Sequence, residues 1–230
     1  MKSSSPSKPV TQGSLLEKWL RIEADITKDL EVVAQYKASN SCPAPAQKLI
    51  DLSRQGASRS GRARVGLINR AVDLSIRPTS DETQWGVSDH WSDPFETLQS
   101  SLGDCEDYAI VKYAALRAAG FQRDAVKLVV LRNHFPSEDH AVAAVWVDNE
   151  WLILDNRTLT LVRDTDVTRA IPRFVLDDQG VRRFVENRRN PKTANAVAPP
   201  AIARRLWLDR LGNREISALP VSHQGYDQGA

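Results

Sequence analysis

The sequence predicts an α+β fold in which helices come first and a run of antiparallel strands follows. Apolar residues recur at helical spacing over residues 14–37. Residues 105–119 contain neither glycine nor proline, and Gly120 follows as a helix stop. Short segments rich in valine, leucine and isoleucine come next, separated by turn residues, which is typical of strands. This order of elements indicates a layer of helices packed on a sheet.

The remaining elements can be placed along the chain in the same way. Two more helices are expected at residues 47–54 and 63–74, with a polar connector between them and an irregular segment at 77–94. Strands are expected at residues 126–131, 140–147, 151–154, 159–163, 173–176 and 181–185, and a last helix at 201–211. We divide the chain into a flexible lead (1–13), a main domain (14–187) and a linker with a C-terminal tail (188–230).

Charge and cysteine content narrow the classes of function. The 230-residue chain has 31 basic and 29 acidic side chains, a net charge of +2, so no electrostatic feature favours nucleic acid or an anionic membrane as a partner. Apolar runs such as 141–147 are far shorter than the ~20 residues of a membrane span, so no membrane insertion is expected. The two cysteines, Cys42 and Cys105, are too few for a disulfide framework or a thiolate-rich metal site. A disulfide between them would leave neither thiol free to react.

Cys105 stands at the start of an expected helix, directly after Gly103 and Asp104. Cysteine attacks as the thiolate, and a helix N-terminus favours that form because the first backbone N–H groups stabilise negative charge. The same N–H groups can hold a developing oxyanion. We expect Gly103 to give the backbone the freedom to turn into the helix. Cys105 is therefore a candidate nucleophile, with a buried structural cysteine as the alternative.

His140 and Asp155 are expected to lie side by side on a β-hairpin. If the chain turns at residues 148–149, the two side chains become diagonal neighbours on one face, within reach of each other. A carboxylate in that position would orient an imidazole that acts as the base for Cys105. His90 is the main rival base, and an unpaired, exposed histidine and aspartate are the other alternative.

Several motifs resemble one known family. They are residues 85–91, 94–98 and 103–113, with shorter matches at 140–142 and 154–156. Over roughly residues 63–185 the chain resembles the bacterial transglutaminase-like cysteine proteinases of the LapG type. This resemblance implies a papain-like or transglutaminase-like core, with the cysteine helix packed on the sheet, and a catalytic triad of Cys105, His140 and Asp155.

The resemblance also implies a biological role. Proteases of this type are periplasmic, and they release large biofilm adhesins by cutting near the N-terminus at a di-alanine site. A membrane cyclic-di-GMP receptor controls them, and they depend on calcium. The first ten residues of this chain do not form the apolar core of a signal peptide, so a cytoplasmic location is the alternative.

Acidic residues surround the candidate nucleophile. Asp104, Glu106 and Asp107 should raise the pKa of the thiol by like-charge repulsion, and a bound cation would offset this. Calcium prefers carboxylate oxygens, and the family resemblance implies calcium at these three residues. The alternative is a helix start, with Asp104 as the cap and the other two favoured by the helix dipole.

These observations favour a calcium-dependent cysteine endopeptidase that acts on a surface protein. Oxyanion or substrate-cleft donors are expected in the tryptophan segment, at Gln84, Trp85 and Trp91. Because one acyl-enzyme can be resolved by water or by an amine, an acyl transferase or amidase on the same triad stays open. A binding module that keeps the fold without catalysis is the non-enzymatic alternative.

Overall fold

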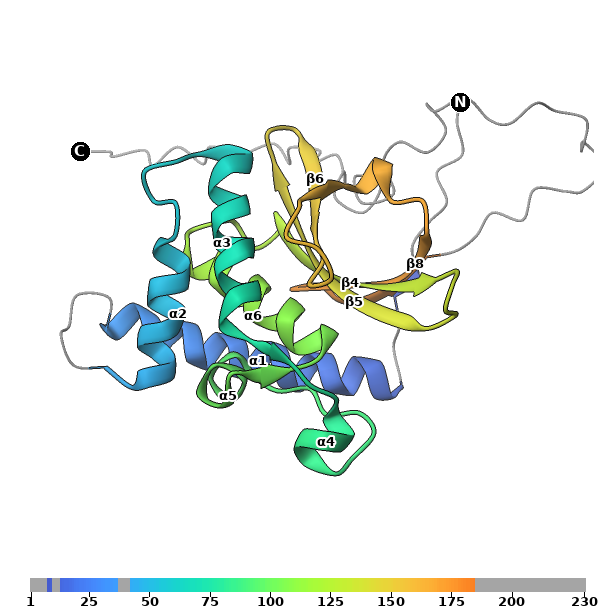
Figure 1. The fold of residues 1–230 in the computed structure, drawn as a ribbon, viewed down its shortest axis with the longest axis horizontal. Helices are drawn as coiled ribbons and strands as arrows, with labels where there is room; N and C mark the ends of the chain where they lie inside the picture. The colour runs from blue at the N-terminus through green and yellow to red at the C-terminus, as the bar shows by residue number, and fades with distance from the viewer. Residues whose placement is uncertain (1–7, 10–12, 37–41, 185–230) are drawn as a thin grey trace, which may run out of the picture.

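A layer of helices packs on one face of an antiparallel sheet in the computed structural model, which describes residues 8–9, 13–36 and 42–184 (Figure 1). The helices are α1 (Ser14–Tyr36), α2 (Ala44–Arg54), α3 (Gly61–Ser75), α4 (Asp81–Trp85), α5 (Pro94–Ser100), α6 (Cys105–Ala118) and the 3-10 helix η1 (Asp164–Asp166). The strands are β1 (Lys8–Pro9), β2 (Arg77–Pro78), β3 (Leu102–Gly103), β4 (Val126–Asn133), β5 (Asp139–Val147), β6 (Glu150–Leu154), β7 (Val162–Arg163), β8 (Ala170–Asp177) and β9 (Gly180–Arg183). The expected α+β class is confirmed.

The main sheet has the strand order β1-β9-β8-β4-β5-β6-β7, and neighbouring strands are antiparallel. Alternate residues of β5 face two different apolar clusters. Ala141, Ala143 and Val145 join the core against the helices, whereas Val142 and Ala144 join a second cluster on the other face. The chain from β6 through η1 to β8 arches over this second face (Figure 1). Burial on both faces explains why β5 is apolar without interruption over residues 141–147.

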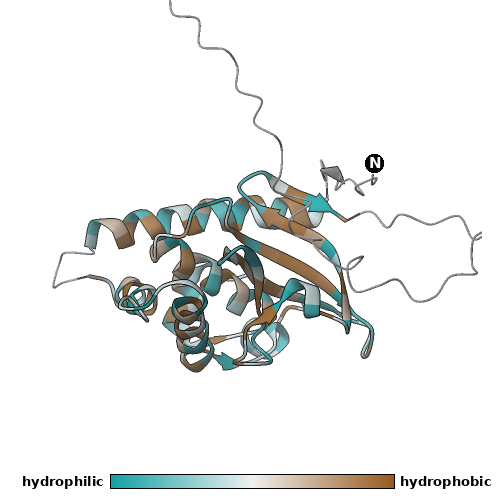
Figure 2. Cartoon of the chain, turned by 90° about the horizontal axis from the view of Figure 1, so that it is seen from above, coloured by the Kyte–Doolittle hydropathy of each residue, from teal (hydrophilic) through white to brown (hydrophobic). Residues whose placement is uncertain are grey.

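Helix α1 is amphipathic, and its apolar stripe faces the core (Figure 2). Trp19, Ile22 and Ile26 are buried at the spacing that the sequence predicted. The Trp19 indole donates a hydrogen bond to the carbonyl of Asp177 at 2.9 Å, and its ring meets that of Tyr113 edge-on at 5.7 Å. One tryptophan thus links α1 to the end of β8 and to α6.

Helix α6 is buried on almost every side, as expected from its apolar residues all round. It packs on β4 and β5 and also contacts α1, α2, α3 and α5. Small residues such as Ala114 and Ala115, both 0% exposed, let neighbouring elements come close to its axis. Gly120 adopts a positive φ directly after it, as a helix stop requires.

Two predicted helices, α2 and α3, begin earlier than expected (α3 at Gly61 rather than at residue 63), and one predicted strand is shorter. Helix α2 begins at Ala44 rather than at residue 47, because Pro45 lies in the first turn, where a missing N–H costs nothing. The segment predicted to be irregular contains β2 and α4, and the sequence did not predict α5. The strand expected at 159–163 shortens to Val162–Arg163, because Leu161 packs into the helical core instead of extending the ladder.

Other predictions concern the chain ends. Lys8–Pro9, in the predicted lead, pairs with β9. The predicted linker and tail, with the helix expected at 201–211, lie outside the described residues, so the domain division stays a prediction. Among the described helices, none has the length and apolar character to cross a membrane.

A buried carboxylate from α1 lies at the start of α5. Asp29 is only 8% exposed, and its Oδ2 accepts a hydrogen bond from the Phe95 N–H at 3.1 Å. Asp93, which caps α5, accepts a second bond from the Glu96 N–H at 2.8 Å. Burial and the charge of Asp93 raise the pKa of Asp29 from 3.8 to about 7. The folded protein therefore holds this proton more tightly than the unfolded chain does.

We expect Asp29→Asn to stabilise the protein at about pH 8 and to have a smaller effect at about pH 5. Because the folded pKa is raised, the stability of the parent falls as the pH rises from 3.8 to about 7, and the loss is complete above that range. Asparagine keeps an acceptor for the Phe95 N–H and cannot ionise. Thermal unfolding at both pH values measures the effect, and Asp51→Asn on the exposed side of α2 controls for the lost charge. A pH-independent difference would contradict the assignment.

Candidate active site

Segments that are far apart in the sequence meet at the start of α6. The parallel pair of β2 and β3 joins residues 77–78 to residues 102–103, and the Thr79 N–H donates to the Gly103 carbonyl at 3.0 Å. Helix α4 follows β2 and α6 follows β3, so this pairing holds α4 near Cys105. Strand β5, which carries His140, packs against α6.

The register of the β5–β6 hairpin agrees with the sequence prediction. Val147 pairs with Glu150, and Asp148 and Asn149 both have the positive φ that a tight two-residue hairpin turn requires. His140 Nε2 lies 2.9 Å from Oδ1 of Asp155, within hydrogen-bonding distance. The two residues expected to be diagonal neighbours are therefore in direct contact.

The Asp155 carboxylate is held in its ionised form. Burial alone would raise its pKa, but the hydrogen bond from His140, with the charge of that ring and the Arg157 N–H at 2.9 Å, holds the pKa below its usual value. His140 is 2% exposed, and its Nδ1 is buried with no hydrogen-bond partner among the described residues. Nδ1 is thus the ring nitrogen that is free to exchange a proton.

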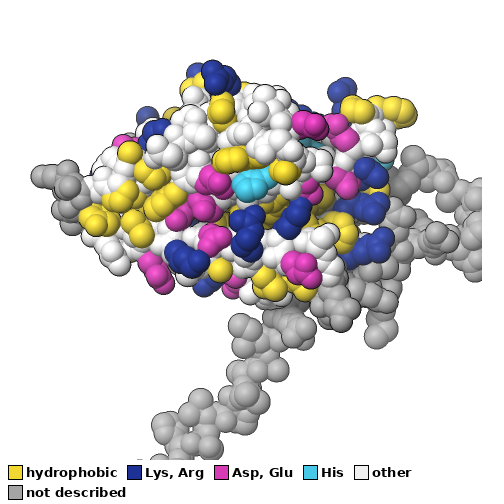
Figure 3. Space-filling model, turned by 90° about the horizontal axis from the view of Figure 1, so that it is seen from below, with side chains coloured by type: hydrophobic (Ala, Val, Ile, Leu, Met, Phe, Trp, Pro, Cys, Tyr) yellow, Lys and Arg dark blue, Asp and Glu magenta, His cyan; other side chains and the backbone are white. Residues whose placement is uncertain are grey.

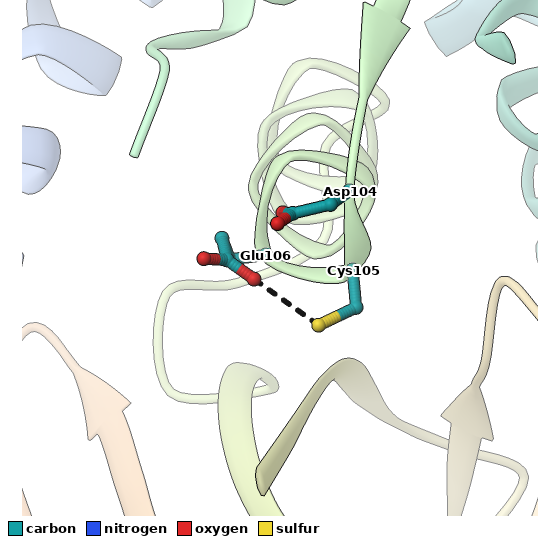
Figure 4. Close-up of side chains that lie close together, drawn as sticks. All are labelled: Asp104, Cys105 and Glu106. Carbon is teal, nitrogen blue, oxygen red and sulfur yellow. Dashed lines mark hydrogen bonds between the residues drawn. The ribbon is translucent and has the colours of Figure 1, made fainter. Parts of the chain in front are cut away.

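Cys105 occupies the first turn of α6 (Figure 4). Its Sγ donates a hydrogen bond to Oε2 of Glu106 at 3.1 Å, and the backbone N–H of Ala141, next to His140, lies within reach of the sulfur. Burial and the Glu106 charge raise the pKa of the thiol, and the Ala141 N–H acts against them. Both Cys105 and Cys42 are free, so no disulfide blocks the thiol.

The N-terminus of α6 is braced by a buried carboxylate. Asp107 is 0% exposed, and it accepts hydrogen bonds from the Ser92 N–H at 2.9 Å and the Asp104 N–H at 3.3 Å. Gly103 does not have a positive φ, so the expected backbone freedom is not what the turn into the helix requires. It is needed instead for a close approach, because a Cβ there would lie 2.7 Å from the Cβ of Asp107. This correction follows from the tertiary position of Asp107.

Carboxylates gather beside the thiol, but they extend beyond the predicted three. The ligand atoms of Asp81, Asp104 and Asp107 lie within 4.8 Å of one another, and so do those of Asp81, Asp89 and Glu106. Asp81 and Asp89, which come from α4 and the loop after it, were not predicted as ligands from the sequence. Their acidic character was visible in the sequence, but only the β2–β3 pairing brings them to α6.

Burial, together with like-charge contacts, favours the protonated forms of Asp104 and Asp107. Burial, with the neighbouring Glu106, raises the pKa of Asp104 to about 8, and burial raises the pKa of Asp107 to about 7. Oδ1 of Asp104 is buried and has no hydrogen-bond partner within the described residues. The set of oxygens is the chemistry that a hard cation such as calcium requires.

The three residues predicted to line the cleft, Gln84, Trp85 and Trp91, differ in their contacts and in their exposure. Gln84 donates to Ser100 Oγ at 3.4 Å, and Trp91 is buried in the core. Trp85 is 37% exposed and stacks on His90, whose Nε2 lies 3.2 Å from Oε2 of Glu96. The imidazole of His90 therefore already contacts Glu96 and Trp85.

The other two histidines, His134 and His223, give no stronger candidate for the base than His140. His134 lies in the loop after β4, where its N–H donates to the Arg169 carbonyl at 2.9 Å, and His223 lies outside the described residues.

On the face around α4, acidic, basic and apolar side chains are interspersed around a histidine (Figure 3). A substrate on this face would meet both charged and apolar groups.

The comparisons with known proteins identify the family and the fold. The sequence model described as bacterial transglutaminase-like cysteine proteinase matches residues 37–169, more than half of the chain. The chain belongs to this family. It is a cysteine protease of the transglutaminase-like type, and Cys105, His140 and Asp155 all lie in the matched region. No curated protein matches the chain.

Solved structures show the same fold. LapG of Legionella pneumophila in its calcium-bound form is 19% identical, with a TM-score of 0.51, over 68% of this chain and 90% of that chain. The EGTA-treated form of the same protein is 18% identical, with a TM-score of 0.53, over 69% of this chain and 84% of that one. The fold of this transglutaminase-like proteinase is therefore shared with LapG.

We expect Gly103→Ala to destabilise the protein by about 1–3 kcal/mol, because the new methyl group would overlap the buried Asp107 side chain. Gly66→Ala in α3 is the matched control. A Cβ at Gly66 would meet only Leu161 at 3.6 Å, and alanine favours a helix over glycine by about 1 kcal/mol. Denaturant unfolding compares the two variants. Equal stability of Gly103→Ala and the parent would show that the contact with Asp107 can relax without cost.

Proposed function

We propose that this family member is a cysteine endopeptidase in which Cys105, His140 and Asp155 act as the triad. The observation that carries the proposal is the 2.9 Å contact between His140 Nε2 and Asp155 Oδ1. It leaves Nδ1 free on the strand that packs against the helix beginning at Cys105. A thiol at a helix start, an imidazole and an orienting carboxylate are the groups that covalent peptide hydrolysis needs.

In the proposed reaction, His140 Nδ1 takes the proton of the Cys105 thiol, and the sulfur attacks the peptide carbonyl carbon. Asp155 fixes the tautomer and stabilises the imidazolium. The ring then gives the proton to the leaving amine as the C–N bond breaks. Water, deprotonated by the same nitrogen, hydrolyses the acyl-enzyme and restores the thiol. The backbone N–H of Cys105 is our candidate for one oxyanion donor, and the segment with Gln84, Trp85 and Trp91 for the other.

The hydrogen bond from Cys105 Sγ to Glu106 is relevant to this chemistry. It directs the thiol proton toward a carboxylate rather than toward the imidazole (Figure 4). For the reaction, Glu106 must release the sulfur. A ligand that draws the Glu106 carboxylate toward Asp81 and Asp89 would favour that release.

We propose calcium as that ligand. Asp81, Asp89, Asp104 and Glu106 offer the oxygen atoms that would hold it, and the unpartnered Oδ1 of Asp104 supports the fit. Asp107, predicted as a third ligand at this helix start, has both backbone bonds to maintain and contributes less. A bound cation would supply positive charge beside the thiol, which lowers the cost of forming the thiolate.

The family resemblance extends the proposal to a substrate. It favours a periplasmic enzyme that cuts a large surface adhesin at a di-alanine site under control of a membrane cyclic-di-GMP receptor. Incubation with candidate surface proteins, followed by mass mapping of the new ends, tests it. A free carboxylate at the cut indicates hydrolysis. A product joined to an added amine would instead support the acyl transferase reading, and uncut proteins would contradict the substrate assignment.

We expect Cys105→Ala to abolish cleavage and His140→Ala to lower kcat by about 10²–10⁴-fold, because proton transfer is lost. Asp155→Asn should cost less, since the amide oxygen can still accept the bond from Nε2. Cys42→Ala is the matched control and should keep most of the activity, because its thiol donates only to Gln47. Cleavage rates at saturating substrate measure this. Full activity of His140→Ala would remove the triad.

We expect chelation to lower the cleavage rate and the melting temperature, and calcium to restore both better than magnesium. Calcium tolerates a flexible site of many oxygens, whereas magnesium requires a near-octahedral shell. A ligand that binds only the folded state raises its stability by mass action. Asp81→Asn and Glu106→Gln should weaken the response, and Glu82→Gln, exposed and outside the acidic cluster, should not. Superimposable unfolding curves of the parent with calcium and with chelator would contradict a calcium site.

A further inference from the structure

A buried ion pair between Lys112 and Asp73 lies next to the backbone that leads to Asp155. Lys112 in α6 has a side chain that is 0% exposed, and its Nζ lies 2.6 Å from Oδ1 of Asp73 in α3, whose side chain is 4% exposed. Lys112 follows Cys105 by about two helical turns, so both side chains lie on the same face of α6. The proposed peptide hydrolysis does not use this pair.

The Lys112 ammonium also reaches the strand that leads to Asp155. Nζ donates to the carbonyl of Leu154 at 3.4 Å, and Leu154 is the last residue of β6. The ladder between β5 and β6 ends at the pairing of Ala143 with Leu154, so Asp155 lies beyond it. Lys112 therefore holds the backbone at Leu154, where the hydrogen-bonded ladder between β5 and β6 ends.

The charges around this pair are coupled to the site. Burial lowers the pKa of Lys112, and the charges of Asp73 and Asp155 act in the opposite direction. Burial also raises the pKa of Asp73. The charge of Lys112 lowers this pKa, and the charge of Asp155 raises it further. Without the ammonium, two carboxylates would face each other across the protein interior, where charge repulsion is poorly screened.

A second contact fixes the ammonium from the side. Nζ lies 5.9 Å from the centre of the Tyr108 ring, and the Tyr108 hydroxyl donates to the carbonyl of Ile76 at 2.6 Å. Ile76 follows α3, the helix that carries Asp73. Lys112 is thus enclosed by α3, its own helix and the end of β6.

We infer that Lys112, held by Asp73, is a positioning residue that fixes Asp155 against His140. It acts through the Leu154 carbonyl, which sets the backbone before Asp155, and through its positive charge, which favours the ionised form of the partly buried Asp155 carboxylate. The inference rests on the proposed role of Asp155 in orienting His140. Lys112 itself touches neither the thiol nor the imidazole within the described residues.

The chain offers a matched control in a second buried lysine–aspartate pair. Lys127 in β4 lies 2.8 Å from Oδ2 of Asp177, and both are buried. Lys127 is opposite Ala144, whereas His140 is opposite Leu131, so this pair lies toward the other end of the β4–β5 ladder. Its loss should affect stability without reaching the site.

The test uses Lys112→Met, which removes the charge and keeps most of the volume, with Lys127→Met as the control. Lys112→Met alone takes the ion-pair partner from the buried Asp73 carboxylate, which can prevent folding, whereas Asp177 keeps Arg182 as a partner in Lys127→Met. The double variant Asp73→Asn with Lys112→Met removes both charges and is the one expected to stay folded. Asp155→Asn reports the effect of losing the carboxylate itself.

Two measurements need no natural substrate. In protein labelled with ¹⁵N-histidine, the Nε2–H signal of His140 reports its hydrogen bond to Asp155. The rate at which iodoacetamide carboxamidomethylates Cys105, followed by peptide mass in the presence of calcium, reports the activated thiol. We expect both Lys112 variants to shift or lose the signal and to slow labelling by about tenfold, as for other groups that orient a primary ligand. Lys127→Met should lower only the melting temperature.

The outcomes separate this inference from the proposed function. A parental His140 signal and parental labelling rate in the folded double variant would overturn the positioning role. If Asp155→Asn leaves the labelling rate unchanged, the triad fails, and the His140 signal still decides whether Lys112 positions Asp155. Equal losses of signal in the Lys112 and Lys127 variants would also overturn the inference, because a general effect of losing a buried charge would then explain both.

Discussion

The burial of α6 on almost every side is the constraint on which the rest of this structure depends. A helix buried on almost every side leaves few of the N–H groups at its start to water, so the protein supplies partners. Asp107 reaches back to the Asp104 N–H and outward to the Ser92 N–H, which ties the tryptophan segment to the helix start. The same burial presses α6 on β5, so that Cys105 lies beside the strand that carries His140.

Charge is distributed unevenly around the candidate site, and this shapes its chemistry. Carboxylates gather beside Cys105, where they oppose the thiolate, and a buried lysine lies close to the backbone before Asp155, where its charge favours the carboxylate. The helix start by itself favours a thiolate, but here burial and Glu106 outweigh it. A cation bound among the carboxylates would favour the thiolate, so occupancy of the acidic cluster would control the reactivity of Cys105.

Much of the site could be predicted because it depends on short-range regularities. Side chains of a strand alternate with a period of two, so a two-residue turn at residues 148–149 was enough to place His140 beside Asp155. The position of Cys105 followed from the glycine-free and proline-free segment after it. By contrast, the reason given for Gly103 was wrong, because the closeness of Asp107 is a contact that no local pattern reveals.

The sequence by itself determined the fold class, the start of the cysteine helix and the register of the hairpin, because each follows from periodicity and turn chemistry within a few residues. Only the tertiary structure decided which charges meet. The β2–β3 pairing brings Asp81 to the start of α6, and the packing of α3 on α6 joins Asp73 to Lys112. Such contacts depend on the burial of whole elements against one another, and electrostatic energy depends on distance through space rather than on separation along the chain.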